Sequence, residues 1–314
     1  MRIYDVKRRS LVLASAVSYA LALGIGLAQA YPAKPIRLIV PFPAGDAADS
    51  LAEALPQKLG EKIGQTLGFE NRPGAGGTMG AEVASKSVAD GYTLLLATSS
   101  TYNIGPAINP RIPDNAEINF TSIASVASSP KVVVVANTLP AKSMRELIDY
   151  ARKNPGKLND ALSGNGTVVH LTTEYFKAQS DTFILHIPYR GTALAACDLV
   201  SSKVDLLFDS FGAGMPHVND GGLRALVVTS AKRSAIAPEM PTVAETVPTF
   251  EYVTRFGRYG PKNLPPDRIG KIEVSVNAAL ADNDGKKRFA HLGAELVGGA
   301  PKAFTAMVKL DAGK

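Results

Sequence analysis

The sequence has little of the chemistry that most catalytic sites use. Its 314 residues include one cysteine, Cys197, no tryptophan and four histidines. A single cysteine excludes a disulfide within the chain, and its position excludes a lipid anchor directly after an N-terminal apolar segment. No two histidines have the spacing of a metal site, and no G-x-S-x-G turn presents a serine nucleophile. We therefore expect neither a metal nor a cofactor, and few routes to catalysis.

Long runs of one charge are also missing. The whole chain carries +6, and its first thirty residues hold four basic residues against one acidic residue, which leaves +3 for the rest. Such a weak, scattered positive charge is not the footprint of a nucleic-acid-binding protein. It slightly favours small anionic molecules.

The N-terminus has the three parts of a secretory signal. Lys7, Arg8 and Arg9 are followed by an apolar run over residues 11–27 and by the small-residue triplet "AQA" at 28–30. This pattern predicts cleavage before Tyr31 and a periplasmic protein. An uncleaved anchor helix is the alternative, but the run is barely long enough to span a bilayer. The basic residues do not decide between general and twin-arginine export.

Apolar runs alternate with helical patterns along the rest of the chain. Strands are expected at 36–42, 65–71, 92–99, 129–137, 181–189, 204–211 and 223–230. Helices are expected at 49–64 with a kink at Pro56, and at 79–87, 143–155, 193–203, 266–282 and 284–293. This alternation predicts a mainly parallel, doubly wound α/β arrangement. The strands are too many for one small sheet, so we expect two lobes joined by crossover strands near residues 122–131 and 250–259.

Four junctions between a strand and the next segment are rich in small or hydroxyl residues. They lie in "PFPAGDAADS" (41–50), "LLLATSSTYN" (94–103), "LSGNGTVVHL" (162–171) and "PYRGTALAA" (188–196). In an open α/β sheet, ligands bind beyond the carboxyl ends of the strands, where helix N-termini offer unpaired N–H groups. Each junction alone is equally consistent with an ordinary tight turn. The glycine-rich "NRPGAGGTMG" (71–80) lacks a phosphate-binding signature and is interpreted as a structural loop beside the cleft.

Seven segments in order resemble one family of receptors. They are "YPAKPIRLIVPFPAGDAAD", "ENRPGAGGTMGAE", "DGYTLLLATSST", "LSGNGTVVHL", "IPYRGT", "VDLLFD" and "LRALVVTSAKRS" with "MPTVAE". They are similar to the extracytoplasmic solute receptors of tripartite tricarboxylate transporters, the Bug-type or TctC-like family, from about Tyr31 to Phe304. The resemblance implies a type II periplasmic-binding fold with a ligand cleft between two α/β lobes. It also implies capture of a small carboxylate and delivery to a membrane permease.

The junctions and the resemblance together give an expected ligand-binding set. Its members are Phe42, Ala44, Gly45, Asp46, Asp49, Thr98, Ser99, Ser163, Asn165, Gly166, Thr167, Tyr189, Gly191, Thr192, Asp209 and Arg255. Asp49 is open to a second interpretation, as a helix-start residue that the macrodipole favours. His170 is expected to bond its own loop, and His186 to serve the core.

The sequence departs from the family pattern in three places. Asp46 stands where a second glycine is usual, and Arg255 and Arg258 flank "FG" where an aromatic and an apolar residue are usual. Asp46 and Arg255 could act together on a ligand that carries both charges, or both could face water. The segment "FTAMVKLDAGK" at the end holds only part of the usual last helix.

The expected protein is a monomeric receptor for a small carboxylate. Lobe 1 is assigned to residues 31–127 and 253–314, and lobe 2 to residues 128–252. A ligand-sensing subunit with a signalling partner shares the same cleft and is the main alternative. A periplasmic enzyme is the other, with Asp205 and Asp209 as its only acid–base candidates. The sequence does not identify the carboxylate.

Overall fold

The computed structural model describes residues 30–108, 119–234 and 236–312. The chain divides into Met1–Ala33 and Lys34–Lys314, and the second unit contains all the helices and strands described below. The signal expected at residues 1–30 lies almost wholly outside the described residues. No described helix is both long and apolar enough to cross a bilayer.

The first sheet has three parallel strands followed by two long antiparallel ones. Its order is β2 (Leu67–Asn71), β1 (Ile36–Val40), β3 (Thr93–Thr98), β9 (Val253–Pro261) and β4 (Phe120–Ala136), and the short β10 (Glu295–Leu296) pairs with β4. Parallel neighbours need crossover connections, and helices provide them. These are α2 (Ala47–Ala54), α3 (Pro56–Ile63), the 3₁₀ turn η1 (Ala75–Gly77) and α4 (Thr78–Ser85).

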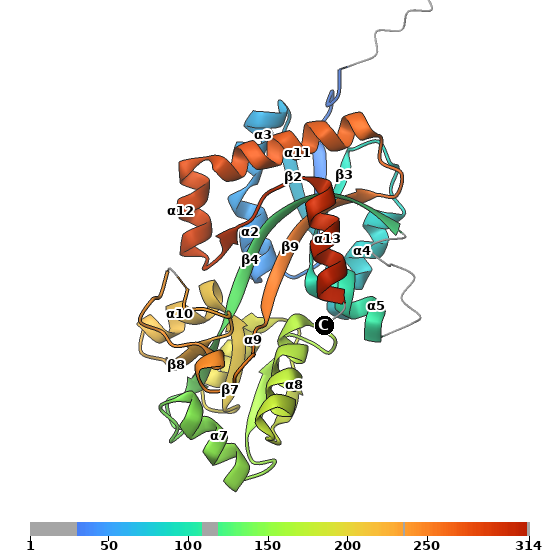
Figure 1. Cartoon of the computed structure of the whole chain (residues 1–314). Coiled ribbons are helices and arrows are strands. Elements are labelled where there is room, and N and C mark those ends of the chain that lie inside the picture. The colour runs from blue at the N-terminus through green and yellow to red at the C-terminus, as the bar shows by residue number, and fades with distance from the viewer. Residues whose placement is uncertain (1–29, 109–118, 235, 313–314) are drawn as a thin grey trace, which may run out of the picture. The chain divides into compact units, whose positions relative to one another are not determined.

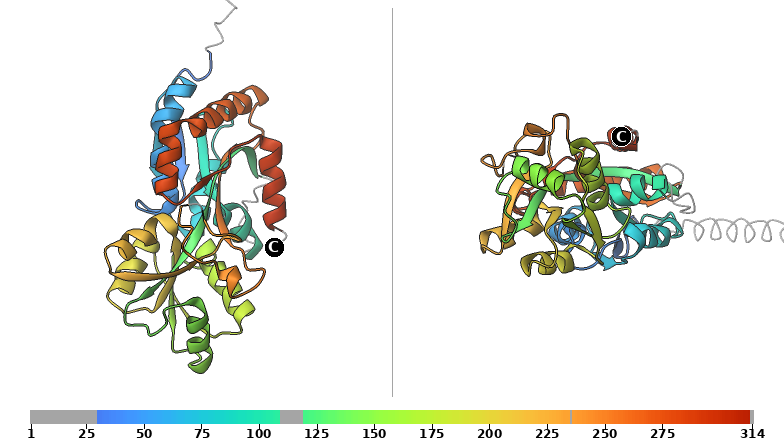
Figure 2. Two further views of the ribbon diagram at one scale, coloured as in Figure 1. Left: turned by 60° about the vertical axis from the view of Figure 1, so that its left-hand side comes forward. Right: turned by 90° about the horizontal axis from the view of Figure 1, so that it is seen from below.

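The second sheet uses the other end of β4. Its strands β7 (Leu206–Ser210), β5 (Asn159–Leu162) and β6 (Leu185–Pro188) follow β4 in that order, and β8 (Leu223–Val228) also pairs with β4. The helices of this part are α7 (Met144–Lys153), α8 (Val168–Ser180), α9 (Thr192–Val200) and α10 (Phe211–Asn219), with the 3₁₀ turn η3 (Val243–Glu245). Helices cover both faces of the strands (Figure 2).

β4 and β9 connect the two sheets. They run side by side through the middle of the molecule (Figure 1), with Phe120 paired to Pro261 at one end and Pro130 paired to Val253 at the other. From Lys131 onwards β4 pairs instead with β7 and β8. The crossover strands expected near residues 122–131 and 250–259 are therefore confirmed. The fold is the two-lobed α/β arrangement with crossover strands that the sequence predicts.

The apolar run in β4 fills two cores. Val133 and Val135 belong to the cluster that includes Phe176 and Phe208, whereas Val132 and Val134 belong to the cluster on the other face of the sheet. Successive side chains of a strand point to opposite faces, so a sheet covered on both faces needs an unbroken apolar run. This explains why "VVVV" shows no alternation with polar residues.

The remaining helices extend the first lobe. The π-helical turn η2 (Ser100–Ile104) and α5 (Gly105–Ile108) follow β3, and α11 (Pro266–Ala281), α12 (Asn283–His291) and α13 (Pro301–Ala312) end the described chain. The last segment thus forms a three-turn helix, and its Phe304 is buried against Tyr102 and Tyr259. At Pro56 the expected kinked helix is two helices, because α2 ends at Ala54 and Pro56 starts α3.

Candidate functional site

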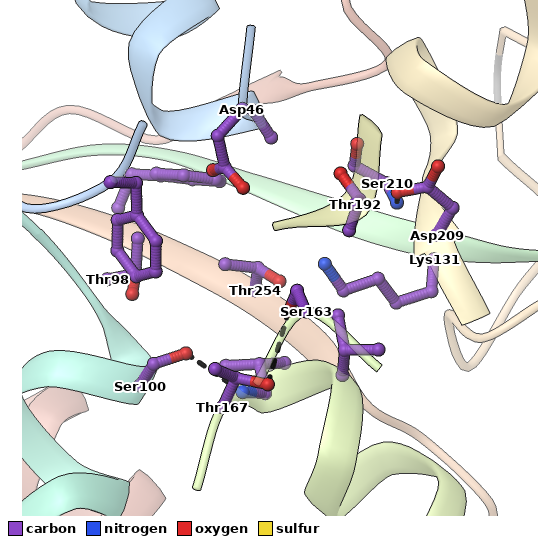
Figure 3. Close-up of a pocket in the computed structure, with 15 residues that line it drawn as sticks. Asp46, Thr98, Ser100, Lys131, Ser163, Thr167, Thr192, Asp209, Ser210 and Thr254 are labelled. Carbon is purple, nitrogen blue, oxygen red and sulfur yellow. Dashed lines mark hydrogen bonds between the residues drawn. The ribbon is translucent and has the colours of Figure 1, made fainter. Parts of the chain in front are cut away.

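A small polar cavity lies where the carboxyl ends of strands from both sheets meet β4 and β9. Its volume is about 30 Å³, room for roughly two water molecules. Seven residues of the expected set line it: Phe42, Asp46, Thr98, Ser163, Thr167, Thr192 and Asp209. Eight further lining residues were not anticipated: Ala47, Ser100, Lys131, Val168, Val169, Ser210, Thr254 and Phe256. Figure 3 shows how these side chains converge.

The loop between β1 and α2 brings Asp46 to this cavity. Asp46 caps α2, since its Oδ1 accepts a hydrogen bond from the backbone N–H of Ala48 at 3.0 Å. Asp49 does not line the cavity. Its buried carboxylate accepts hydrogen bonds from Gly45 N at 2.9 Å and from Asn71 Nδ2 at 2.7 Å. Asp49 therefore holds the loop in shape, and Ala44 and Gly45 are exposed parts of that loop.

The loop between β5 and α8 brings Ser163 and Thr167. Thr167 caps α8, accepting from His170 N at 3.3 Å and donating to Gly164 O at 2.8 Å, and Ser163 Oγ donates to Thr167 Oγ1 at 3.2 Å. The next N–H, that of Val168, donates to Ser100 Oγ at 2.8 Å. Two hydroxyls thus organise the positive end of α8 at the cavity.

Two neighbours in the same loop lie outside the cavity lining. Asn165 is exposed, and the N–H of Gly166 donates to Nδ1 of His170 at 3.1 Å. His170 therefore bonds its own loop, as expected. Gly166 has a backbone φ of +73°, a conformation that residues other than glycine adopt only with strain. The glycine-rich turn η1 packs against this loop, with Gly76 next to the carbonyls of Asn165 and Gly166.

The ends of β6 and β7 form the far wall. Asp209 is buried, and its Oδ1 accepts from Ser210 N at 2.7 Å. Burial raises the pKa of Asp209 to about 6, against the opposing field of Lys131. Thr192 is the buried first residue of α9. Tyr189 and Gly191 lie just outside the cavity, and the Tyr189 hydroxyl donates to Asp198 Oδ2 at 2.9 Å.

Two hydroxyls of the cavity, those of Thr98 and Thr254, are buried and have no hydrogen-bond partner among the described residues. The ammonium of Lys131, a buried residue, likewise forms no hydrogen bond or ion pair with any described residue. Lys131 is 5% exposed, and burial lowers its pKa while Asp209 and Asp46 oppose that shift. Buried polar groups are normally hydrogen-bonded, so these three mark a space built for a polar ligand. The one signal in the sequence was a lysine within the apolar run "SPKVVVVAN".

Arg255 and Ser99 lie at a different cavity. Alternation along β9 turns Thr254 and Phe256 toward the polar cavity, whereas Arg255 lines a larger space of about 490 Å³ with Ser99, Tyr175 and Glu251. Ser99 Oγ accepts from Arg255 N at 2.9 Å. In this structure Asp46 and Arg255 therefore do not face one space. The larger cavity is bordered mainly by apolar side chains and lacks the convergent helix starts of the smaller one.

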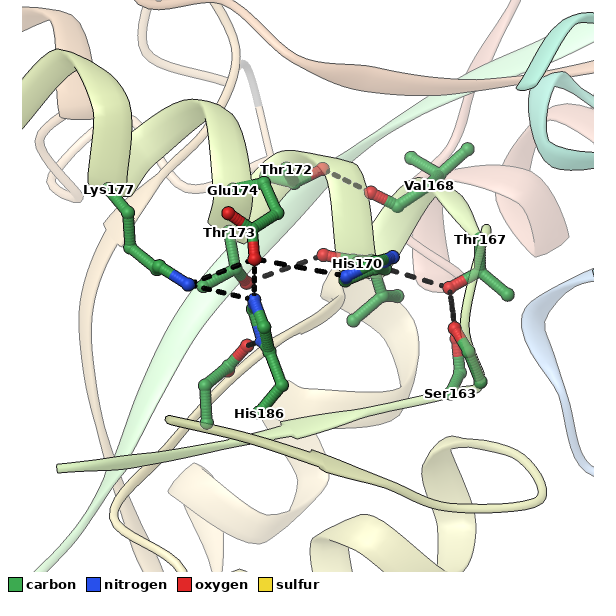
Figure 4. Close-up of polar contacts among 12 residues, drawn as sticks. Ser163, Thr167, Val168, His170, Thr172, Thr173, Glu174, Lys177 and His186 are labelled. Atoms are coloured by element: carbon green, nitrogen blue, oxygen red, sulfur yellow. Dashed lines mark hydrogen bonds and ion pairs between the residues drawn. The ribbon is translucent and has the colours of Figure 1, made fainter. Parts of the chain in front are cut away.

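A cluster of ionisable groups supports α8 behind the cavity (Figure 4). His170, Glu174 and His186 have ligand atoms within 4.8 Å of one another, an arrangement that the sequence spacing did not reveal. However, the Lys177 ammonium lies 2.9 Å from Glu174 Oε1 and 3.0 Å from His186 Nε2, and His170 Nδ1 already accepts from Gly166. Lysine thus supplies the positive charge that a metal would bring. His186 also lies 3.5 Å from the buried carboxylate of Asp160.

Comparison with known proteins identifies relatives over most of the chain. Residues 51–309 match the model of TctC, the tripartite tricarboxylate transporter family receptor. Protein BugT of Bordetella pertussis is 36% identical over 276 residues, which cover 87% of this chain and 85% of BugT. A UPF0065 protein encoded between tcbD and tcbE in a Pseudomonas species is 35% identical, covering 90% of this chain and 84% of that protein.

Solved structures share the fold over nearly its whole length. Rpa4515 of R. palustris with adipate has a TM-score of 0.87 at 31% identity, covering 90% of this chain and 95% of that one. MatC of Rhodopseudomonas palustris with bound malate has a TM-score of 0.84 at 25% identity, covering 90% and 98%. Periplasmic binding protein BugD has a TM-score of 0.80 at 31% identity, covering 90% and 95%.

Proposed function

The chain belongs to the TctC family of tripartite tricarboxylate transporter receptors, and we propose that it captures a small carboxylate in the polar cavity at the strand ends. It is a solute-binding receptor and not an enzyme. The relatives with adipate and with malate support a carboxylate as the ligand. Delivery to the membrane permease of a tripartite transporter is the step that follows capture.

The observation that carries this proposal is the convergence of unsatisfied donors on one cavity. The hydroxyls of Thr98 and Thr254 are buried without partners, and the first turns of α8 and α9 lie beside them. Hydroxyls and helix N-termini together bind anions without a surface basic patch. Of the ligand-binding set expected from the sequence, the seven residues that line the cavity belong to this proposal, with Lys131, Ser100, Ser210 and Thr254 added.

The size of the cavity implies that the lobes separate to admit a ligand. A volume of about 30 Å³ is smaller than any dicarboxylate. We assign residues 31–127 and 253–314 to one lobe and 128–252 to the other, and β4 and β9 to the hinge. The first boundary lies inside β4 and the second directly before β9, so bending of these strands opens the cleft without a flexible linker.

Export supplies the compartment in which such a receptor works. We propose that residues 1–30 are a signal peptide, that the mature periplasmic protein starts at Tyr31, and that it acts as a monomer. N-terminal sequencing of the exported protein checks the start, and recovery of intact Met1 from membranes would contradict it.

Calorimetry with adipate, malate, glutarate and glutamate tests carboxylate capture. We expect saturable binding of at least one of them, weakened in Thr254→Val by the loss of one hydrogen bond, about 0.5–1.5 kcal/mol. Thr138→Val is the matched control, because Thr138 is exposed and does not line the cavity. Equal affinities in the wild type and Thr254→Val would remove this cavity from the binding site.

A further inference from the structure

Lys131 places a positive charge inside the cavity without a contact partner. It is the first residue of β4 to pair with β7, and its amino group points into the space among Asp46, Thr254 and Ser163 (Figure 3). Among the described residues, no carboxylate oxygen lies within 4.0 Å of this nitrogen and no acceptor forms a hydrogen bond with it. A buried ammonium without a partner is costly. The cavity therefore lacks an anionic group at this point.

Two carboxylates face the same space from opposite sides. Asp46 comes from the start of α2 and Asp209 from the end of β7, and both act electrostatically on Lys131. Asp209 is buried and already accepts from Ser210 N. Asp46 is only half-buried, and Oδ1 alone is engaged, with Ala48 N. Asp46 is thus the carboxylate with room for another donor.

The charges in this cavity disfavour a simple dicarboxylate. When ionised, Asp46 and Asp209 outnumber Lys131, so a ligand with two negative charges meets repulsion in a space with little water. A ligand with one carboxylate and one ammonium has a partner for each end.

We propose that the ligand is a small zwitterionic amino acid, whose carboxylate binds Lys131 and the Thr254 hydroxyl and whose ammonium binds Asp46. This inference rests on the proposed function and narrows its ligand class. In this proposal Lys131 and Asp46 determine specificity. The hydroxyls and the helix N-termini would bind the carboxylate of any ligand.

Two pairs of probes isolate the ammonium group. Glutamate differs from glutarate, and alanine from propionate, only by the amino group. In calorimetry on the mature protein, we expect the amino member of at least one pair to bind roughly 30-fold tighter than the member without an amino group. The member without an amino group cannot form the desolvated ion pair with Asp46 and leaves that carboxylate without a partner. Equal or tighter binding of the member without an amino group in both pairs would overturn the proposal.

Two variants assign the two ends of the ligand. Asp46→Asn keeps a good helix cap but removes the charge, and should bring the ratio within a pair close to one. Lys131→Met keeps the side-chain volume and should weaken the tighter-binding member roughly 30-fold. Asp149→Asn and Lys157→Met, both exposed on the second lobe, are the matched controls and should change nothing. An unchanged ratio in Asp46→Asn contradicts the role of Asp46.

The outcomes separate this inference from the function beneath it. Binding of glutarate or propionate without an amino preference overturns the zwitterion and leaves the carboxylate receptor standing. Absence of binding by all four probes, and by adipate and malate, overturns both. Circular dichroism of each variant, with a wild-type melting curve as the reference, distinguishes lost binding from lost folding.

Discussion

The hydroxyl of Ser100 accepts a hydrogen bond from the backbone N–H of Val168 at 2.8 Å. Ser100 directly follows Ser99 at the end of β3 in the first sheet, and Val168 is the first residue of α8, which follows β5 of the second sheet. Both line the polar cavity. The bond therefore joins the part of the cavity wall that follows β3 to the part that follows β5. It uses one of the N–H groups that a helix start leaves unpaired.

Removal of this bond should favour the open receptor. In Ser100→Ala the closed form loses one hydrogen bond, about 0.5–1.5 kcal/mol, while the open form loses none. Small-angle scattering of the ligand-free protein should show a larger radius of gyration, and ligand affinity should fall. Ser87→Ala removes an exposed hydroxyl on the first lobe and should leave the radius unchanged. A wild-type radius in Ser100→Ala would count against the bond as a latch.

The cap of α8 couples stability to binding. Thr167→Ala removes the side-chain oxygen that accepts from His170 N and the contact with Ser163, and should lower the free energy of unfolding by about 1 kcal/mol. Thr167→Ser retains the side-chain oxygen and should keep most of this free energy of unfolding. Urea unfolding measures the loss. If Thr167→Ala unfolds at the same midpoint as the wild type, the cap does not stabilise the helix.

The buried pair of Asp160 and His186 should make stability depend on pH. Burial raises the pKa of Asp160 to about 6, and Asp160 in turn raises the pKa of His186. A carboxyl with a raised pKa stabilises the fold fully below its unfolded value near 4, and this stability is lost as the pH rises to about 6. Asp160→Asn cannot ionise. Between pH 4 and pH 7, the free energy of unfolding of Asp160→Asn should therefore rise relative to that of the wild type by on the order of 1–3 kcal/mol.

Urea unfolding of both proteins at several pH values in that range measures this difference. Titrating groups remote from Asp160 contribute equally to the two proteins and cancel. His186 is coupled to Asp160, so the same comparison is made in a His186→Gln background, which removes its titration. Parallel stability curves for the wild type and Asp160→Asn would show that Asp160 ionises normally in the fold.

Arg258 should cost stability rather than provide it. It is fully buried in β9, and none of its guanidinium nitrogens has a hydrogen-bond partner among the described residues. Burial alone lowers its pKa to about 10, so it stays charged at neutral pH. Arg258→Met retains the apolar stem and should raise the free energy of unfolding by about 1–3 kcal/mol. The exposed Arg145→Met is the control. A destabilised Arg258→Met would mean that the charge has a partner.

Gly257 and Phe304 leave no room for a methyl group between them. A Cβ on Gly257 would lie 1.9 Å from Cζ of Phe304, which belongs to α13. Gly257→Ala should therefore destabilise the protein by about 1–3 kcal/mol through overpacking. Adding Phe304→Leu to Gly257→Ala should restore part of the lost stability, because leucine is shorter than the phenylalanine that the new methyl group would contact. Thermal melts of the two single variants and the double variant measure the coupling, and simple additivity would contradict the clash.

The sequence predicted the strands with apolar runs and the junctions that supply the cavity, because both depend on local composition. The first half of β4 was expected only as a crossover strand near residues 122–131, because "FTSIASVASS" is rich in serine and alanine rather than β-branched residues. The sequence did not predict α10, which contains Pro216. Which side chains enter the cavity depended on sheet register. Thr254 and Arg255 are neighbours in sequence and point to opposite faces of β9. Only the position of β9 in the sheet decides that Thr254 lines the polar cavity and Arg255 lines the other one. Lys131 was missed for the same reason.

The position of β9 between β3 and β4 has a consequence for how the protein is made. The strands at 93–98 and 120–136 leave the ribosome long before residues 253–261, yet they do not pair with each other and must wait for the strand that separates them. Until then the nascent first sheet exposes two unpaired strand edges, which are sites of aggregation. A chain in this state cannot complete its fold before most of it has been synthesised. The order of the strands thus favours chaperone protection of the chain during synthesis.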